Sequence, residues 1–381
     1  MTRLIDSLLS VRGAALLALA AAAMMALMFA RWEKVEEKAA YRPVTFAELE
    51  GWYQDDHAAA FRTLLATCRK RAKSNKACKA ALALGDGVDR DAARAFFEAH
   101  FTPHAVVHHE SKGMVTGYYE PELNGAREQG GKFQVPVYKR PDDLVTLRPD
   151  TMRARYNDEI TGTIAGIPKT KHRAVPYYTR AEIESGVLAG RGLELLWLDD
   201  PVELFFMQIQ GSGRVRLPDG STVRLGYAAK NGHSYTSIGK RLLAMGEGRP
   251  ERMTMDGIKS WLRADPERGR ALMNENRSYV FFQMFEGDGP IGAQGVVLTP
   301  GRSLAVDTAY HALGAPVYVT APKLAPDGAP FRRLMIAQDV GSAIRGPERG
   351  DIYFGSGDAA GAIAGRTKHA ANFYVLLPKK R

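Results

Sequence analysis

The sequence predicts a mainly β protein with accessory helices, an α+β fold, and three observations carry this prediction. Short runs rich in β-branched and aromatic residues alternate with glycine and proline turns. Apolar residues recur at helical spacing in two stretches, 46–101 and 235–274. The 38 glycines and 20 prolines form no low-complexity tract, so they read as turns. Short, turn-rich strands at this density favour small barrels over an open sheet.

The helical stretches are predicted from spacing. Phe61, Leu64, Leu65 and Cys68 fall on one helical face, as do Ala93, Phe96, Phe97 and His100, with glycine breaks at positions 85 and 87. A short helix is expected at 179–186, with Thr179 as its N-cap and Gly186 as its stop. Further helices are expected at 235–245, at 255–263 and in a turn to Asn274.

Strands are expected on both sides of these helices, and residues 142–176 are expected to be loop-rich because they lack a clear pattern. A Pro-Asp-Gly turn at 218–220 indicates a hairpin. The predicted strand runs are 104–110, 112–123, 133–141, 193–200, 202–213, 214–220, 221–232, 279–285, 293–300, 302–307, 315–320, 333–339, 350–355 and 372–378.

The N-terminus carries a targeting segment. Residues 13–30 are apolar throughout, with Arg3 and Arg12 before them and Arg31 and Lys34 after them. A helix of this length spans about 27 Å, close to the thickness of a thin bilayer core. The segment is a membrane anchor or a cleaved signal peptide, and either would export the rest of the chain. A buried helix of the folded body is the remaining interpretation.

The net charge and the two cysteines indicate which partners and which cell compartment to expect. The net charge of +10 indicates an anionic environment or partner, such as nucleic acid, acidic lipid or an anionic polysaccharide. The basic residues are scattered, which argues against nucleic acid. Cys68 and Cys78 are expected to form one disulfide in an exported chain, with two separate buried thiols as the alternative. No cysteine or histidine spacing indicates a metal site, and no cofactor is expected.

Three aspartates near the C-terminus are the candidate catalytic residues. Asp307 and Asp339 end strand-like runs, and Asp351 stands in the glycine-rich segment 350–357. Glycine lets a substrate approach the backbone closely. A carboxyl group partly removed from water has a raised pKa and can donate a proton near neutrality. These residues therefore indicate acid–base chemistry in a groove.

The motifs around these aspartates resemble a known family. The three positions match, in order, those of the 3D domain, a double-psi β-barrel of cell-wall-active enzymes. Other blocks resemble the membrane-bound lytic murein transglycosylase A family, and the likeness covers roughly residues 45–378. These blocks are GMVTGYYEPEL (113–123), VPVYKRP (135–141), MQIQGSGRVRLPDGS (207–221) and GYAAKNGHSYTSIGK (226–240).

The resemblance implies a fold, an activity and roles for residues. Members of the family cut the β-1,4 bond between N-acetylmuramic acid and N-acetylglucosamine in peptidoglycan without using water. By resemblance, Asp351 is the acid and then the base, and Asp339 and Asp307 are candidate neighbours that raise its pKa. Residues of suitable chemistry for holding sugars are Tyr118, Tyr119, Glu120, Gln208, Gln210, Lys230 and Tyr235. Gln208 and Gln210 are expected to share one face of a strand.

The implied organisation has several parts. Residues 1–12 would be cytoplasmic, 13–30 the anchor or signal, and 31–45 a polar stalk. A double-psi barrel would comprise 46–121 and 276–381, with a smaller barrel, 122–275, inserted. Many relatives carry a lipid-modified cysteine after the signal; this chain has none there, so its anchoring must differ.

The expected location is the periplasm, and the expected partners are peptidoglycan strands, the membrane and other cell-wall enzymes. Two other functions remain open at this point. One is a peptidoglycan hydrolase that uses two aspartates, and the other is a non-catalytic peptidoglycan-binding protein.

Overall fold

The computed structural model describes residues 40–70, 76–107, 113–148, 152–164, 167–247 and 253–379. The larger of its two compact units, Tyr41–Val106 with Ser111–Arg381, holds the elements described below. Within the described residues, no helix combines the length and the apolar character needed to cross a bilayer. The predicted anchor or signal at 13–30 lies outside the described residues.

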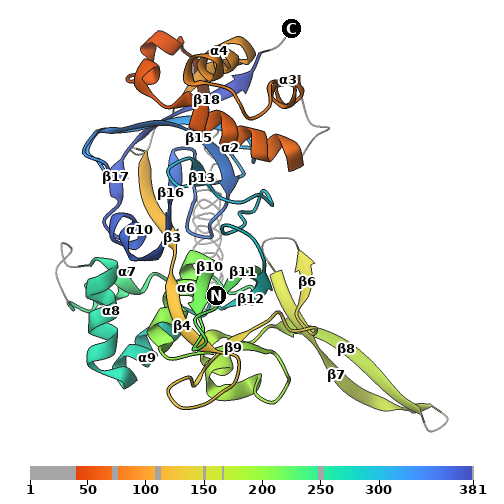
Figure 1. The fold of residues 1–381 in the computed structure, drawn as a ribbon. Coiled ribbons are helices and arrows are strands. Elements are labelled where there is room, and N and C mark those ends of the chain that lie inside the picture. Colours follow the sequence, from red (N-terminus) through yellow and green to blue (C-terminus); the bar gives the residue numbers. More distant parts are fainter. Residues whose placement is uncertain are drawn as a thin grey trace, which may run out of the picture. The chain divides into compact units, whose positions relative to one another are not determined.

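The fold class is mainly β with accessory helices, as predicted (Figure 1). One sheet has nine strands in the order β1-β2-β18-β14-β15-β13-β16-β3-β17. Its β13–β15 and β16–β3 pairs are parallel. In chain order its strands are β1 (Ala40–Pro43), β2 (Phe101–Val107), β3 (Met114–Glu120), β13 (Ser303–Val306), β14 (Pro316–Ala321), β15 (Phe331–Asp339), β16 (Arg349–Ser356), β17 (Lys368–Ala370) and β18 (Asn372–Pro378).

Helices from the N-terminal part of the chain pack against this sheet. The helices predicted around Phe61 and Phe97 are confirmed as α2 (His57–Lys70) and α4 (Arg90–His100). Both rings are fully buried and share one apolar core with Leu334 and Ile336 of β15. The expected disulfide joins Cys68 of α2 to Cys78 of α3 (Lys76–Leu84). The 3-10 turns η1 (Phe46–Glu48) and η2 (Trp52–Gln54) precede α2, and α10 (Gly357–Ala364) follows β16.

A second sheet has six strands in the order β12-β11-β10-β4-β9-β5. The predicted hairpin is confirmed, because β10 pairs antiparallel with β11 around Gly220, which has a φ of 84°. The strands of this sheet are β4 (Glu122–Ala126), β5 (Val135–Tyr138), β9 (Glu194–Leu198), β10 (Ser212–Arg216), β11 (Thr222–Lys230) and β12 (Val280–Phe285). The helices between them in the chain are α5 (Arg180–Glu182), η3 (Ile183–Val187), α6 (Pro201–Gln210), α7 (Ile238–Ala244), α8 (Met255–Ala264) and α9 (Pro266–Glu275).

The two sheets are connected through one continuous stretch of chain. Strand β3 belongs to the nine-stranded sheet and β4 to the six-stranded sheet, and Pro121 alone separates them. Proline cannot donate to a strand ladder, so the pairing partner changes at this residue. The residue before it, Glu120, is therefore placed where the two sheets meet.

Residues 202–213 were expected to be a strand, and this prediction is wrong for most of the segment. Residues 201–210 form α6, and the Asp200 carboxylate accepts hydrogen bonds from the backbone N–H groups of Val202 and Glu203. Pro201 occupies the first turn and Gly211, with a φ of 83°, ends the helix. The helix is buried on most sides, so its apolar run shows no 3.6-residue period.

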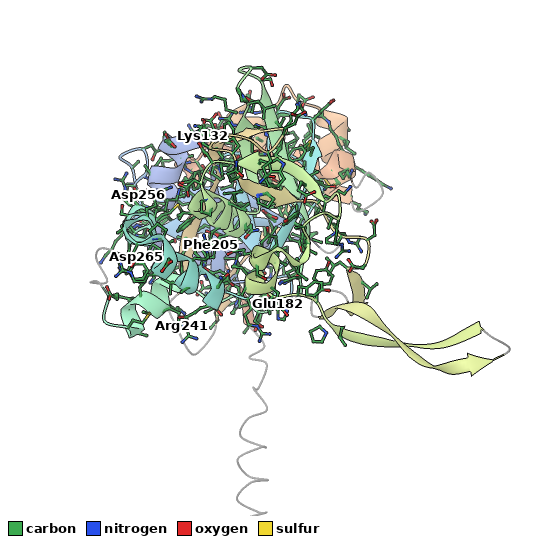
Figure 2. All side chains as sticks on the ribbon, turned by 90° about the horizontal axis from the view of Figure 1, so that it is seen from below. Lys132, Glu182, Phe205, Arg241, Asp256 and Asp265 are labelled. Atoms are coloured by element: carbon green, nitrogen blue, oxygen red, sulfur yellow. A yellow bond between two sulfur atoms is a disulfide. The ribbon has the colours of Figure 1, made fainter. Side chains whose placement is uncertain are left out.

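Residues 142–176 were expected to be loop-rich, and this prediction is also wrong. They form a three-stranded sheet of β6 (Val145–Arg148), β7 (Met152–Ile164) and β8 (Ile167–Pro176). Beyond the short β6 ladder, β7 and β8 continue as a two-stranded arm (Figures 1 and 2). The sequence of these strands has no consistent apolar face, so periodicity carried no signal.

Residues 293–300 were expected to be a strand but form a turn-rich loop. Gly295, with a φ of 77°, donates its N–H to the carbonyl of Gly292, and Val297 bridges back to Ile291. The loop lies against the end of β15, because the N–H of Gln294 donates to the carbonyl of Gln338 at 2.9 Å.

Candidate active site

Five residues form a row across one face of the nine-stranded sheet. Asp339 on β15 pairs with Ala305 on β13, and Ala305 pairs with Asp351 on β16. Asp351 in turn pairs with Thr116 on β3, and Thr116 pairs with Lys368 on β17. Directly paired residues point their side chains to the same face of a sheet. The row therefore places two carboxylates, a hydroxyl and an ammonium group on one surface.

A β-bulge places Asp339 in this row. The register runs from Leu304 opposite Ala337 to Ala305 opposite Asp339, so Gln338 is the extra residue. The Gln338 side chain is fully buried, donating to Thr63 and Thr67 of α2. Without the extra residue Ala305 would face Gln338, and the second carboxylate would lie on the wrong side of the sheet.

Asp351 is half-buried and accepts a short hydrogen bond. The hydroxyl of Thr116 donates to Asp351 Oδ1 at 2.6 Å. Arg349 Nη2 donates to the same Thr116 oxygen at 2.8 Å, so the single Thr116 hydrogen is directed at Asp351. Oδ1 is thereby engaged, and Oδ2 is the oxygen left to exchange a proton with a ligand.

The surroundings of Asp351 suit a proton donor. Burial raises the pKa of Asp351 from 3.8 to about 6, and the negative charge of Asp339 adds to the rise. The Thr116 hydrogen bond and the Arg349 charge act in the opposite direction on that pKa. Burial dominates, so a substantial fraction of Asp351 is protonated in mildly acidic solution.

Asp339 is held by protein donors on both oxygens. The hydroxyl of Tyr118 donates to Oδ2 and the N–H of Ala293 donates to Oδ1, each at 2.9 Å. Burial raises the pKa of Asp339, while these hydrogen bonds oppose the rise. The Tyr118 ring reaches Asp339 from β3 and packs in one apolar cluster with Ala305, whose small side chain lies between the two carboxylate strands.

Asp307 has a different environment. It is buried, and its carboxylate accepts hydrogen bonds from the backbone N–H groups of Ala309 at 3.1 Å and Gly346 at 2.9 Å. Its own carbonyl accepts from Tyr310 and His311. Asp307 therefore ties the turn after β13 to the segment before β16, which is a structural role.

The substrate candidates on β3 are engaged inside the protein. Tyr118 and Tyr119 point to opposite faces, and Tyr119 packs against Ala360 and Ala364 of α10. Glu120 has no exposed surface. Its carboxylate accepts from Arg224 at 2.9 Å and from the Ser356 hydroxyl at 2.7 Å. Glu120 thus joins β16 of one sheet to β11 of the other.

The expectation for the two glutamines is wrong because both lie on α6. Residues two apart on a helix point in widely different directions, unlike residues two apart on a strand. Gln208 is buried and donates to the carbonyl of Val280 at 3.3 Å. The side-chain amide oxygen Oε1 of Gln210 accepts a hydrogen bond from the Tyr119 backbone N–H at 3.1 Å.

Lys230 and Tyr235 lie on the six-stranded side of the molecule. Lys230 is half-buried at the end of β11, and its Nζ lies 3.4 Å from the Ser342 hydroxyl in the loop after Asp339. Tyr235 is partly buried in the segment before α7, and burial raises its pKa. Of the two, Lys230 is the residue that reaches the segment after Asp339.

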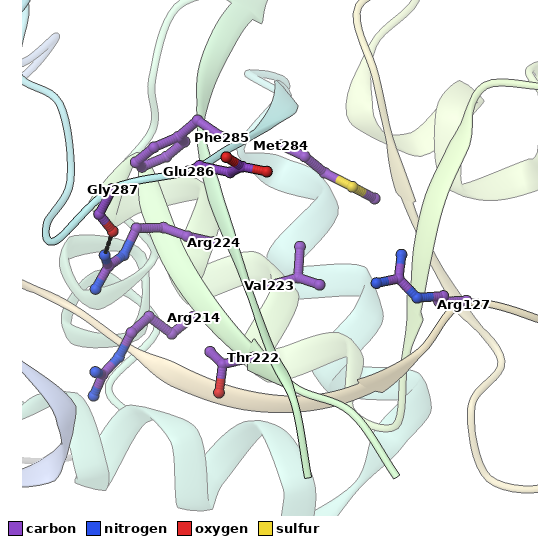
Figure 3. A pocket seen from close by; sticks show the side chains of 9 residues that line it. All are labelled: Arg127, Arg214, Thr222, Val223, Arg224, Met284, Phe285, Glu286 and Gly287. Carbon is purple, nitrogen blue, oxygen red and sulfur yellow. Dashed lines mark hydrogen bonds between the residues drawn. The ribbon is translucent and has the colours of Figure 1, made fainter. Parts of the chain in front are cut away.

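A recess of about 670 Å³ opens on the six-stranded sheet (Figure 3). Two arginines that line the recess already bind protein groups. Arg224 donates hydrogen bonds to Glu120 and to the Gly287 carbonyl, and Arg214 forms an ion pair with Glu122 at 2.9 Å. The lining residues are Arg127, Arg214, Thr222, Val223, Arg224, Met284, Phe285, Glu286 and Gly287. The recess is thus separate from the row that carries Asp351.

Sequence reasoning missed Thr116 and Arg349. Arg349 stands two residues before Asp351, so the alternation of a strand places it on the same face. Thr116 lies 235 positions from Asp351, and its role depends on the parallel pairing of β3 with β16. No local pattern could indicate that pairing.

A carboxyl group with a pKa of about 6 that shares a sheet face with a second carboxylate is typical of enzymes that use acid–base catalysis. Comparisons with known proteins specify the class further. The family description "MltA specific insert domain" matches residues 114–283, and "3D domain" matches residues 302–377.

Relatives agree with these matches. A membrane-bound lytic murein transglycosylase from Agrobacterium tumefaciens is 36% identical with a TM-score of 0.80, covering 89% of this chain and 98% of that one. Escherichia coli MltA with bound chitohexaose is 27% identical with a TM-score of 0.63, covering 91% and 94%. The chain belongs to the membrane-bound lytic murein transglycosylase A family.

A curated relative is aligned over a shorter stretch. "Membrane-bound lytic murein transglycosylase A" of Vibrio cholerae is 33% identical over 269 residues. That stretch is 69% of this chain and 65% of the relative's length.

Proposed function

We propose that this protein is a lytic transglycosylase that cleaves the β-1,4 bond between N-acetylmuramic acid and N-acetylglucosamine in peptidoglycan. The observation that carries the proposal is Asp351, a half-buried carboxyl group with a pKa of about 6 that is oriented by Thr116. The chitohexaose bound by the E. coli relative supports a β-1,4-linked amino-sugar chain as the ligand. Family membership supports peptidoglycan as the natural polymer.

In the first step Asp351 acts as the general acid. Its Oδ2 proton passes to the glycosidic oxygen as the bond to muramic acid C1 breaks, and C1 gains oxocarbenium character. The N-acetylglucosamine leaves with a hydroxyl group. The resulting Asp351 carboxylate is stabilised by the Thr116 hydrogen bond and by the Arg349 charge.

In the second step the same carboxylate acts as the base. It accepts the proton of the muramic acid C6 hydroxyl, whose oxygen attacks C1 and closes a 1,6-anhydro ring. Because this nucleophile belongs to the same sugar, it has a large effective concentration and no water is consumed. Asp351 ends the cycle protonated, so one carboxyl group is sufficient for both steps.

Asp339 supports this cycle without exchanging a proton. Both of its carboxylate oxygens accept hydrogen bonds from protein donors, which fixes Tyr118 and the loop 293–300 in place. Its negative charge helps keep Asp351 protonated. A hydrolase that used Asp339 as the base for a water molecule is the alternative, but it would need an Asp339 oxygen to leave its present donor.

Lys230 is a proposed substrate contact, since its Nζ lies beside the loop that follows Asp339. We also infer a periplasmic location with a membrane tether in residues 13–30. Relatives from Gram-negative bacteria are named membrane-bound, which supports this inference.

Digestion of purified sacculi tests the activity. The wild-type protein should release muropeptides with 1,6-anhydromuramic ends, each lighter by one water than the hydrolytic product. Asp351→Ala should release none. Reducing-end products from the wild-type protein would favour the hydrolase, and equal yields from both proteins would reject the role of Asp351.

A further inference from the structure

We propose that Arg349 and Lys368 form a subsite for a carboxylate on the lactyl-peptide arm of muramic acid, next to Asp351. The inference rests on the proposed function for the identity of the polymer. It adds a preference for negatively charged substrate that neutral amino-sugar chains do not satisfy.

Both cations lie on the same face as the catalytic carboxyl group. Arg349 precedes Asp351 by two residues on β16. Thr116 lies on the neighbouring strand β3, and Lys368 on β17 pairs directly with Thr116 from the other side. The strands β16, β3 and β17 lie side by side (Figure 1). Arg349 Nη2 is 2.8 Å from Thr116 Oγ1, and paired Cβ atoms such as those of Thr116 and Lys368 are about 5 Å apart. Arg349 therefore contacts Thr116 directly, and Lys368 stands beside Thr116 on the same face of the sheet.

Protein carboxylates leave this pair incompletely neutralised. Among the described residues, the Arg349 guanidinium donates to Thr116 Oγ1 and to the Gly350 carbonyl, which accounts for two of its five N–H donors. Lys368 is exposed, and its ammonium makes no ion pair or hydrogen bond with the described residues. Asp351 is the carboxyl group on this face nearest to Arg349 in the row, and it must be protonated to act.

Glu348 is another acidic residue close to Arg349 in the described part of the chain. Glu348 is offset by one residue from Arg349, and its carboxylate accepts a hydrogen bond from the Phe373 backbone N–H at 2.8 Å. A half-buried arginine has lost part of its hydration and gains from a carboxylate partner. The structure thus provides two cationic donors on one face beside Asp351, and Lys368 is exposed to solvent.

The chemistry of the polymer identifies the anion. Muramic acid differs from N-acetylglucosamine by a 3-O-lactyl group, whose carboxyl is free on bare strands and amide-linked to a peptide on substituted ones. The peptide then supplies its own carboxylates. A carboxylate at Arg349 would also offset the positive charge that opposes protonation of Asp351, so binding would favour the acid form of the enzyme.

Binding measurements test the subsite without turnover. Asp351→Asn protein is titrated calorimetrically with a muramic acid-containing tetrasaccharide in three forms, which carry free lactyl carboxylates, lactyl carboxamides or lactyl dipeptides with free carboxylates. The carboxamide form is the neutral match for the first. We expect at least one carboxylate form to bind about three- to ten-fold tighter than the carboxamide. The tighter form identifies whether the lactyl group or the peptide supplies the anion.

Charge-removing variants complete the test. In the Asp351→Asn background, Lys368→Met and Arg349→Met should each bring the carboxylate preference below about two-fold. Lys323→Met removes an exposed lysine from the turn after β14 and should keep the preference. Equal binding of all three sugars, or a preference that survives both subsite variants, would overturn the subsite. Sacculus digestion without anhydro products would reject the lytic activity and leave this binding ratio as an independent result.

Discussion

Asp339 and Asp351 lie on strands that are not neighbours, yet both pair with Ala305 on the strand between them. Two strand spacings separate them, about 9–10 Å. At this separation the Asp339 charge raises the pKa of Asp351 without a direct contact between the carboxyl groups. The alanine leaves room for the Tyr118 ring, which reaches Asp339 from the far side.

Activity should depend on one ionisation. A mechanism that begins with protonated Asp351 predicts that kcat/KM is high in acid and falls as the pH rises through about 6. A hydrolase with a separate carboxylate base would also lose activity in acid, which gives a bell-shaped profile. Measuring initial rates on soluble glycan strands from pH 4 to pH 9 separates the two.

Asp339→Asn tests whether the charge of Asp339 contributes to the pKa of Asp351. The substitution removes a negative charge that helps to raise the pKa of Asp351, so the alkaline limb should move to lower pH. A limb that stays in place would show that Asp339 does not act on Asp351 through its charge.

Thr116→Val should move the limb the other way. Valine has a similar shape but cannot donate the hydrogen bond that stabilises the ionised form of Asp351. Hydrogen bonds to charged groups contribute about 1.5–3 kcal/mol, so an upward shift of about one pH unit or more is expected. Thr116→Ser keeps the hydroxyl and should restore the wild-type profile. Identical profiles for the valine and serine variants would contradict the orienting role.

Asp351→Asn should stabilise the fold above pH 6. The folded pKa of Asp351 is raised from 3.8 to about 6, so ionised Asp351 costs stability that the neutral asparagine does not. The gain is at most about 3 kcal/mol at high pH and disappears below about pH 4, where aspartate is protonated in both states. Urea unfolding at pH 4 and pH 8 measures it; a gain that is the same at both pH values would point to another cause.

Glu120→Ala should destabilise the protein strongly. The substitution leaves Arg224 without its buried carboxylate partner, and breaking a buried pair costs about 3–5 kcal/mol. Glu122→Ala is the matched control, because Glu122 pairs with Arg214 at the surface and its loss should cost less than about 1 kcal/mol. Urea unfolding compares the two. Similar losses would mean that Glu120 does not hold the sheets together.

Local patterns predicted the parts of this protein that depend on neighbouring residues. Helical spacing identified α2 and α4, turn residues identified the β10–β11 hairpin, and the two cysteines were enough to predict the disulfide. The aspartate motifs indicated Asp351 because a short glycine-flanked segment carries that signal. Within α6 the same reasoning failed, since a helix buried on most sides has no apolar stripe.

Only the tertiary structure decided how the site is assembled. The bulge at Gln338 places Asp339 on the same face as Asp351, and the parallel pairing of β3 with β16 brings Thr116 to Asp351. The same fold buries Glu120, which was a candidate substrate contact, and pairs it with Arg224. Strand register and long-range pairing arise from the packing of the whole sheet, so periodicity along the chain determined which elements form but not which side chains meet.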